Sequence, residues 1–571
     1  MLKQDKYETL IEIAKRKGFF WQSFEIYGGV SGFIDLGPLG TKLMKKIEEK
    51  WRNFFIKRLG LLEITTPIIM PYKVFEVSGH VEHFKDPMVE CSSCERKYRA
   101  DHLLKEFAGI SAESLSLEEL DLKIKEIGIK CPECKGVLKS PKYFPTMFIT
   151  TIGPYSQSIG YARPETAQGI FIDFKRIFEI AREKFPLGVA QIGKVLRNEI
   201  SPRQGPIRLR EFTIMEFEFF FDPEDPTCPM LKEVENEVIN IVPLELRVKG
   251  MDEVLCISIK EALKNKYILT EWLAYFMALS KIFITELGVP EEKQRFHEKL
   301  PEERAHYSIQ TYDHEVFLER WGWVEMAGHA YRTNYDLYRH MESTKEDLRV
   351  FKAYEKPITK YIKTISPILS NIEKTFKESS KKVIELLTSL NVEEFEKVMN
   401  EKGYIEINGF KILPSHVEIK AKEVKEYGKK FIPHVVEPSF GVERLIYATL
   451  EYAYTKIKDR DVLKIPPEIA PIQVIVLPLV NKNGLQEKAK EVYSMIAKSG
   501  FDVEYDDSGS IGRRYARADE AGIPLAITID YQTLKDETVT IRDRDTWRQI
   551  RVPISRLEET IKSFLNKNLR A

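Results

Sequence analysis

The sequence predicts an α+β protein built on an antiparallel sheet, with a separate α/β domain at its C-terminal end. Residues 187–200 and 210–221 are two long strand-like runs, and the loop SPRQGPIRL between them predicts an antiparallel hairpin. From about Pro466 short strands and helices alternate to the end of the chain. Because 571 residues exceed what one core usually supports, we expect a larger domain over 1–465 and a smaller one over 466–571.

Composition and charge are those of a globular chain without a membrane segment. Hydrophobic residues make up 43% and charged residues 30% of the chain, and 87 basic side chains balance 87 acidic ones. Bulk charge therefore does not indicate a nucleic-acid partner, and any RNA contact must rely on local patches. The first twenty residues mix charged and apolar side chains, and the longest apolar run, near 472–480, is too short to span a bilayer. We expect a cytoplasmic protein that does not bind membranes.

An amphipathic helix is predicted over residues 41–59. Apolar side chains recur there every four residues, at Leu43, Ile47, Trp51, Phe55 and Leu59. The following segment, ITTPIIMP, is β-branched and apolar, and Pro67 inside it is compatible only with an edge strand or an interrupted strand. We expect this helix and strand to present more apolar surface than a monomer should expose, and therefore to form the interface of a homodimer.

Two further segments have helical character. Residues 343–425 are rich in Lys and Glu at helical spacing and predict a helical insertion that is exposed on one side. In the C-terminal domain, Arg513, Arg514 and Arg517 predict a basic helix. That helix either contacts nucleic acid or is simply solvated, because residues 466–571 carry 16 basic and 16 acidic side chains.

A charged floor is predicted on one face of the hairpin. A period of two puts on that face Gln191, Gly193, Val195, Arg197 and Glu199 from the first strand, and Phe212, Ile214, Glu216 and Glu218 from the second. Arg and Glu side chains on a half-buried sheet are costly unless they pair with each other or with a ligand. The pattern indicates either a site for a charged molecule or a structural ladder of ion pairs.

Two CxxC pairs predict a metal site. Cys91, Cys94, Cys131 and Cys134 form two such pairs, which in a cytoplasmic protein favour metal ligation over disulfides. Four thiolates suit a closed, structural Zn²⁺ site, with two reduced and unliganded pairs as the alternative. We therefore expect a zinc-ribbon insertion over 85–140, with a helix at LSLEELDLKIKEI between the pairs. Cys228 and Cys256 have the character of ordinary buried residues.

Five motifs carry a resemblance to a known family. The run VLRNEISPRQGPIRLREFT (195–213) resembles motif 2, and VVEPSFGVERLI (435–446) resembles motif 3, of the glycine-specific branch of class II aminoacyl-tRNA synthetases. GFIDLGPLG (32–40), SGHVEHFKDPMVEC (78–91) and RPETAQGIF (163–171) are similar to further segments of that branch. The resemblance covers nearly the whole chain and is weakest over 222–310, which we interpret as another insertion, and over 343–425.

The resemblance implies a class II synthetase fold with a C-terminal α/β anticodon-binding domain, and an ATP-dependent glycine–tRNA ligase activity. Glycine, ATP with Mg²⁺ and tRNA(Gly) are the implied partners. It implies catalytic roles for Arg197, Glu199 and Arg444, with Arg197 on the α-phosphate and Arg444 at the other end of the triphosphate. The implied ATP-binding residues are Arg197, Asn198, Glu199, Arg208, Leu209, Phe212, Glu325, Met326, Gly441 and Arg444.

Glycine offers only an ammonium and a carboxylate for recognition. The resemblance implies that the ammonium meets Glu165, Glu216 and Glu437, with Pro438 and Ser439 beside them, and that Arg99 lies near the carboxylate. The mutual repulsion of the three glutamates would be relieved when the ammonium binds, and one of the three can hold a proton in the empty site. His80 and His83 are expected to make polar loop contacts rather than to bind metal.

Two rival functions follow from the same residues. A synthetase-like protein that lost catalysis should have lost these arginines and glutamates, but all are present. A class II synthetase for proline, threonine or serine is the other rival, against which RPETAQG and EPSFG favour glycine.

Overall fold

The computed structural model describes residues 5–110, 112, 115–154, 157–202, 205–388 and 390–565. The chain divides into two compact units, one made of Met1–Leu348 with Pro433–Ala571, and one made of Arg349–Ile432. No helix in the described part of the chain is both long enough and apolar enough to cross a bilayer.

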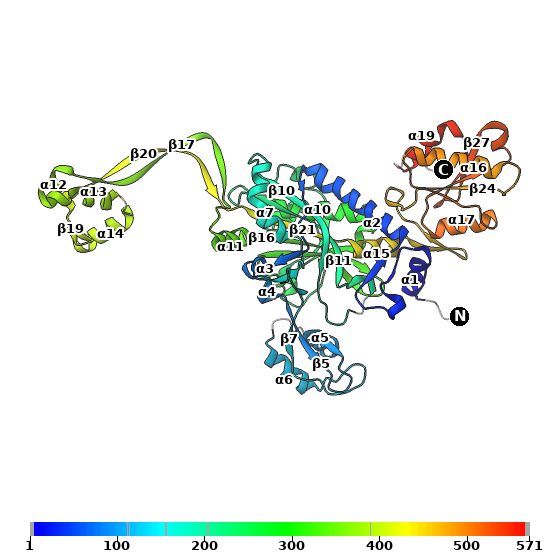
Figure 1. The fold of residues 1–571 in the computed structure, drawn as a ribbon, viewed down its shortest axis with the longest axis horizontal. Helices are drawn as coiled ribbons and strands as arrows, with labels where there is room; N and C mark the ends of the chain where they lie inside the picture. The colour runs from blue at the N-terminus through cyan, green and yellow to red at the C-terminus, as the bar shows by residue number, and fades with distance from the viewer. Residues whose placement is uncertain are drawn as a thin grey trace. The chain divides into compact units, whose positions relative to one another are not determined.

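A nine-stranded sheet forms the centre of the larger unit (Figure 1). In spatial order its strands are β13 (Leu255–Ser258), β12 (Val238–Val242), β14 (Gln294–Glu298), β15 (Gln310–Leu318), β16 (Gly322–Thr333), β21 (His434–Gly441), β11 (Glu211–Phe221), β10 (Leu187–Leu196) and β3 (Leu62–Glu63). Neighbours are antiparallel except for the pairs β12/β14 and β10/β3. The predicted hairpin is confirmed as β10 and β11, in which Gln191 lies opposite Glu216 and Val195 opposite Phe212.

The predicted amphipathic helix is confirmed as α2 (Pro38–Trp51), which continues as a π-helical segment over Arg52–Lys57. Its apolar side chains are not on the surface, because Trp51 and Phe55 are fully buried. The Phe55 ring lies 5.6 Å from Phe217 of β11 and 5.3 Å from Phe440 of β21, between ring centroids. The expectation that this helix exposes apolar surface is therefore wrong, since the sheet of its own chain covers it.

The segment 222–310, which we interpret as an insertion, is continuous with the main sheet. It supplies β12, β13 and β14 to the main sheet, and α10 (Glu271–Glu286), which is buried along most of its length. Phe276 of this helix packs edge-on against Phe217 with centroids 4.9 Å apart. The segment belongs to the core that supports the sheet.

The segment 343–425 is only partly helical. Two long strands, β17 (Val350–Pro367) and β20 (Val417–Phe431), pair antiparallel and carry the helices α12 (Leu369–Phe376), α13 (Ser380–Thr388) and α14 (Val392–Lys402) with the small hairpin β18 (Ile405–Ile407) and β19 (Phe410–Ile412). The prediction of a helical insertion is correct for the middle and wrong for the flanks. In ITKYIKTI the apolar residues stand at Ile358, Tyr361, Ile362 and Ile365, which is a helical spacing, so the pairing of β17 with β20 and not the local period makes this segment a strand.

The cysteine segment forms a small module with its own apolar core. It contains β5 (Lys85–Glu90), β6 (Lys97–Arg99), α5 (Ala100–Ala108), α6 (Leu117–Ile127) and β7 (Lys142–Pro145). The predicted helix between the two pairs is confirmed as α6, which begins with a capping box formed by Ser116 and Glu119.

The C-terminal segment has the predicted alternation of strands and helices. Its sheet has the order β25 (Val503–Tyr505), β24 (Val474–Pro478), β26 (Leu525–Ile529), β27 (Thr538–Asp543), β28 (Gln549–Pro553), packed with α16 (Leu485–Lys498), α17 (Ile511–Glu520) and α19 (Leu557–Leu565). Arg514 on α17 is 2% exposed and donates to backbone carbonyls of Asp507 and Gly509. The basic helix is thus partly structural, because one of its three arginines is buried.

Further elements of the larger unit complete the fold. They are α1 (Lys6–Lys17), β1 (Phe20–Gln22), β2 (Ile34–Leu36), β4 (Ile69–Pro71), α3 (Tyr72–Val77), α4 (His80–His83), β8 (Ile149–Thr151), β9 (Ile159–Ala162), α7 (Ala167–Ile180), α8 (Leu244–Arg247), α9 (Ile259–Lys264), α11 (Tyr335–Thr344), α15 (Val442–Ala453), β22 (Tyr454–Ile457), β23 (Arg460–Leu463) and α18 (Thr533–Asp536). Cys228 is buried as predicted, whereas Cys256 is exposed, which corrects the prediction for that residue.

Candidate active site

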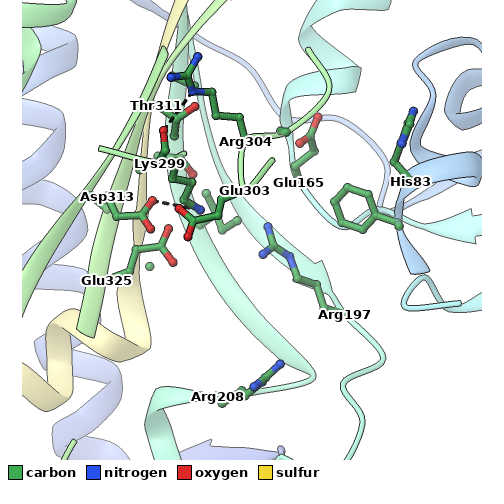
Figure 2. Close-up of a pocket in the computed structure, with 18 of the residues that line it drawn as sticks. His83, Glu165, Arg197, Arg208, Lys299, Glu303, Arg304, Thr311, Asp313 and Glu325 are labelled. Atoms are coloured by element: carbon green, nitrogen blue, oxygen red, sulfur yellow. Dashed lines mark hydrogen bonds and ion pairs between the residues drawn. The ribbon is translucent and has the colours of Figure 1, made fainter. Parts of the chain in front are cut away.

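A cavity of about 780 Å³ lies on the sheet where β11, β16 and β21 run side by side. It is lined by most of the predicted site residues, namely Glu165, Arg197, Glu199, Arg208, Leu209, Phe212, Glu216, Glu325, Met326, Glu437, Ser439, Gly441 and Arg444. Figure 2 shows Arg197 pointing across the cavity toward the side that carries Glu303 and Glu325. Because β11, β16 and β21 are hydrogen-bonded neighbours, residues more than 200 positions apart meet on one floor.

One end of the cavity is organised by a buried cation, Arg332 of β16. Its guanidinium donates to Asp336 (3.0 Å), Glu437 (2.9 Å) and Glu165 (3.3 Å). The ring of Tyr307 lies 3.6 Å from the guanidinium carbon, measured to the ring centroid. Arg332 is 0% exposed, so its charge acts in an environment where water screens little. Arg332 lies outside the five motifs that carry the family resemblance.

Glu165 is held by several donors just before helix α7. Gln168 donates to it over 3.1 Å and Tyr307 over 3.2 Å, and the His80 ring lies 3.2 Å from it. Burial opposes ionisation of this carboxyl, but Arg332 and His80 outweigh burial and hold its pKa well below its usual range. The polar contact predicted for His80 is therefore confirmed, and it joins the site.

Glu216 is buried and accepts three hydrogen bonds. The Thr166 amide donates over 2.6 Å, the Thr166 hydroxyl donates to the same oxygen, and Ser439 donates to the other oxygen over 2.8 Å. Burial and the nearby charge of Glu165 raise the pKa of Glu216. The structural alternative, in which Glu216 pairs with Arg197, is not what the site contains, because Arg197 donates instead to the carbonyl of Pro164 over 3.1 Å.

Glu437 completes the acidic end. Burial raises its pKa to about 8, and Glu216 and Glu165 add to this effect while Arg332 opposes it. Two neighbouring acids in one desolvated space do not ionise with equal ease. The acidic end therefore contains one carboxylate that is firmly ionised, Glu165, and one that is mostly protonated near neutral pH in the empty site, Glu437.

The opposite end is lined by arginines that are held in place by carbonyls and carboxylates. Arg444, in the first turn of α15, donates to the carbonyls of Ile207 (2.9 Å) and Glu325 (2.7 Å) and to the Glu325 carboxylate (3.1 Å). Arg208 pairs with Glu199 over 2.6 Å. Arg197 lies 5.4 Å from the Phe212 ring centroid. These guanidinium groups face a helix N-terminus and an aromatic ring, a combination suited to a nucleotide.

A second group of charged side chains, which lies outside the five motifs, borders this end of the cavity. Lys299 lies 3.2 Å from Asp313 of β15, and both line the cavity near Glu325 (Figure 2). Burial and the charge of Glu325 raise the pKa of Asp313 to about 7, although Lys299 opposes the shift. The only sequence signal is the charged loop KLPEERAHY, which lies within the segment of weakest resemblance.

Three predicted residues do not line the cavity. Arg99 in the cysteine module forms ion pairs with Asp86 (3.2 Å) and Asp101 instead. Asn198 bonds through its backbone to Thr146, and Pro438 lies within β21 opposite His329. The structure places these three beside the site rather than in its wall.

The four cysteines of the two CxxC pairs come together. The Sγ atoms of Cys91 and Cys134 are 3.4 Å apart, and those of Cys94 and Cys131 are 3.6 Å apart. All four lie within 4.8 Å of one another. Thiolate ligands at about 2.3 Å from a tetrahedral Zn²⁺ would be separated by about 3.8 Å, so the cluster has the dimensions of a closed zinc site.

Two comparisons with known proteins concern the C-terminal domain and the fold. Residues 473–564 match the family described as the anticodon binding domain. A prolyl-tRNA synthetase from Cryptosporidium parvum, solved with L-proline and AMP, shares the fold with a TM-score of 0.51 at 14% identity, covering 98% of this chain and 75% of its own.

Relatives named glycine–tRNA ligase match over nearly the full length. Those from Aeropyrum pernix and Pyrococcus horikoshii are each 49% identical, over 99% of this chain and 98% and 99% of theirs. The relative from Methanocaldococcus jannaschii is 45% identical over 99% of this chain and 100% of its own. A chain with this identity, this coverage and this cavity belongs to the glycine–tRNA ligase family of class II aminoacyl-tRNA synthetases.

Proposed function

We propose that the cavity activates glycine with ATP and then transfers the glycyl group to the 3′ end of tRNA(Gly). The observation that carries this proposal is the polarity of one cavity, with Glu165, Glu216 and Glu437 at one end and Arg197 and Arg444 at the other. An ammonium fits the first end and a triphosphate the second, so the carboxylate of glycine is directed toward the α-phosphorus.

Recognition of glycine relies on charge and on the absence of space for a side chain. Glu216 and Glu437 lie on neighbouring strands, and Ser439 both lines the cavity and hydrogen-bonds Glu216. Alanine would have to place a methyl group among buried, mutually bonded side chains. Exclusion of larger amino acids is therefore steric, and no separate editing step is required.

Activation needs negative charge to be balanced on the phosphates. Arg197 and Arg444 would contact phosphate oxygens, Phe212 would stack on adenine, and Glu199 would keep Arg208 in place through their ion pair. ATP enters as its magnesium complex, for which the exposed carboxylate of Glu325 is a suitable oxygen ligand. Attack by the glycine carboxylate forms glycyl-adenylate and releases pyrophosphate.

A structural Zn²⁺ ion in the cysteine module is the second proposal. Its support is the close approach of four thiols that belong to two CxxC turns. Cys94→Ser should release zinc and loosen residues 85–140 while glycine activation falls less than tRNA charging. Purified wild-type protein without stoichiometric zinc would contradict the proposal.

The match of residues 473–564 supports an anticodon-binding role for the C-terminal domain, for which we propose the boundary at 465/466. A homodimer in the cytoplasm is also proposed. The support for dimerisation is a group of exposed isoleucines on and beside the sheet β4–β9–β8, namely Ile68, Ile69, Ile149 and Ile159, rather than the buried helix α2. Light scattering that finds only monomer at micromolar concentration would remove this inference.

The test of the main proposal is amino-acid-dependent exchange of pyrophosphate into ATP across all twenty amino acids. We expect glycine alone to support exchange, because the acidic end leaves no room for a side chain. Exchange with proline, threonine or serine would assign the chain to another specificity, and no exchange at all would favour the noncatalytic rival.

A further inference from the structure

One acidic side chain at the ammonium end has no partner and no access to the cavity. Glu218 is 0% exposed, and neither of its carboxyl oxygens has a hydrogen-bond partner in the described part of the chain. Oxygen atoms of Glu216, Glu218 and Glu437 lie within 4.8 Å of one another. Glu216 and Glu437 line the cavity, whereas Glu218 does not. Glu218 therefore stands directly behind the two acids that a ligand would meet.

The charges that face Glu218 come from four elements and sum to a strongly negative site. They are Glu437 on β21, Arg332 on β16, Glu216 on β11 and Asp336 on α11. Glu165 with His80 adds another acid and a histidine next to Arg332. The hydrogen bonds of Arg332 go to Asp336, Glu437 and Glu165. Arg332 is thus already shared among three carboxylates, and Glu218 receives no bond from it. Arg163, which is also buried, donates to Lys194 and Thr66 instead.

An ionised Glu218 is incompatible with these surroundings. A buried carboxylate without a donor carries the full cost of desolvation, and neighbouring acids this close do not all ionise. Burial, followed by the charge of Glu437, raises the pKa of Glu218 well above its usual range. The surroundings of Glu216 are different, because the three hydrogen bonds that it accepts stabilise a carboxylate. Glu218 lacks both the donors of Glu216 and the ion pair of Glu437, so its environment fits the neutral acid.

We propose that Glu218 is a positioning residue that remains a neutral carboxylic acid and donates its hydroxyl proton toward Glu437 or Glu216, directly or through one bridging water. This proposal rests on the proposed binding of the glycine ammonium by those two residues. A neutral third acid limits the negative charge at this end and supplies a donor that orients a cavity carboxylate from behind. Glu218 does not touch glycine.

Two substitutions and one reference variant separate this role from its alternatives. Glu218→Gln keeps a neutral donor of the same size, Glu218→Met keeps the volume without a donor, and Glu216→Gln removes the charge of a proposed ligand. We expect Glu218→Gln to leave the glycine KM within about twofold of wild type, and Glu218→Met to raise it on the order of tenfold, with ATP KM unchanged in both. The glycine KM of Glu218→Gln should follow the wild-type pH profile between pH 6 and 8, because a neutral residue does not titrate there.

Three outcomes would overturn the proposal. A rise of glycine KM in Glu218→Gln equal to that in Glu216→Gln would show that Glu218 acts as an ionised ligand. An unchanged glycine KM in a folded Glu218→Met would show that the donor orients nothing. A metal bound to wild type beyond the zinc of the cysteine module, and lost in Glu218→Gln, would show that the three acids hold a cation. If Glu218→Met fails to fold, the Glu218→Gln comparison still decides between neutral and ionised. Wild type without glycine-dependent exchange would instead reject the proposed function.

Discussion

The two ends of the cavity achieve charge complementarity in different ways. At the acidic end, Arg332 is 0% exposed, and its partners Glu165 and Glu437 are 5% and 8% exposed. At the phosphate end, Arg444 is 32% exposed and pairs with Glu325, which is 40% exposed. Burial strengthens the electrostatic interactions at the acidic end, and it makes an unpaired charge there costly. The arginines at the phosphate end can instead exchange protein partners for a triphosphate without a large cost to the fold.

The comparison predicts that the largest effect follows loss of the buried cation. Arg332→Met should lower the free energy of unfolding by roughly 3 to 5 kcal/mol and abolish glycine activation, because three carboxylates lose their shared partner. Thermal unfolding and pyrophosphate exchange measure the two effects. Arg320→Met, an exposed arginine outside the cavity, is the matched control. An unchanged melting temperature in Arg332→Met would break the distinction between the two ends.

At the phosphate end, activity and stability should separate. Arg444→Ala should cost about 2 to 4 kcal/mol in the activation step, since a phosphate contact of the transition state is lost. The melting temperature should change little, because Arg444 is partly exposed and its carbonyl acceptors can bond to water. Steady-state exchange kinetics with the Arg320→Ala control test this. Near-normal exchange in Arg444→Ala would mean that this arginine does not act on the triphosphate.

Glu216 tests the acidic end without removing its cation. Glu216→Gln keeps size and hydrogen bonding but removes a charge worth roughly 1.5 to 3 kcal/mol, so glycine KM should rise about tenfold to a hundredfold. ATP KM should stay nearly constant, because the guanidinium of Arg197 bonds to Pro164 and not to Glu216. Glu211→Gln, on an exposed position of the same strand, is the control. A joint fall of ATP affinity and thermal stability, with glycine KM unchanged, would identify Glu216 as a structural residue.

The last prediction concerns the pH dependence of stability and of the glycine KM. A pKa of Glu437 raised to about 8 means that the folded, empty protein binds this proton more tightly than the unfolded chain does. The corresponding stability is present at low pH and is lost as pH rises toward 8. The ammonium of glycine favours the ionised carboxylate, so glycine KM should fall from pH 6 to 8, by at most about tenfold per pH unit. The profile should flatten in Glu437→Gln, and an equally steep profile in that variant would assign the proton elsewhere.

The sequence alone determined the hairpin, the two cysteine pairs and the C-terminal alternation, and the resemblance of its motifs named part of the cavity wall. These features depend on short periods and local spacing, so Gln191 opposite Glu216 follows from a strand period of two and one turn. Motif residues such as Arg197, Glu216 and Arg444 were identifiable because each lies within a contiguous pattern.

Only the tertiary structure decided which charges are shared and which surfaces are covered. The burial and the charged neighbours of Arg332 and Glu218 arise because strands β11, β16 and β21 lie side by side, which no local pattern encodes. The same holds for helix α2. Its apolar stripe predicts an interface, but the sheet of the same chain buries Trp51 and Phe55. Periodicity tells which side chains share a face, but burial and electrostatics depend on what packs against that face, and that is set by contacts distant in the chain.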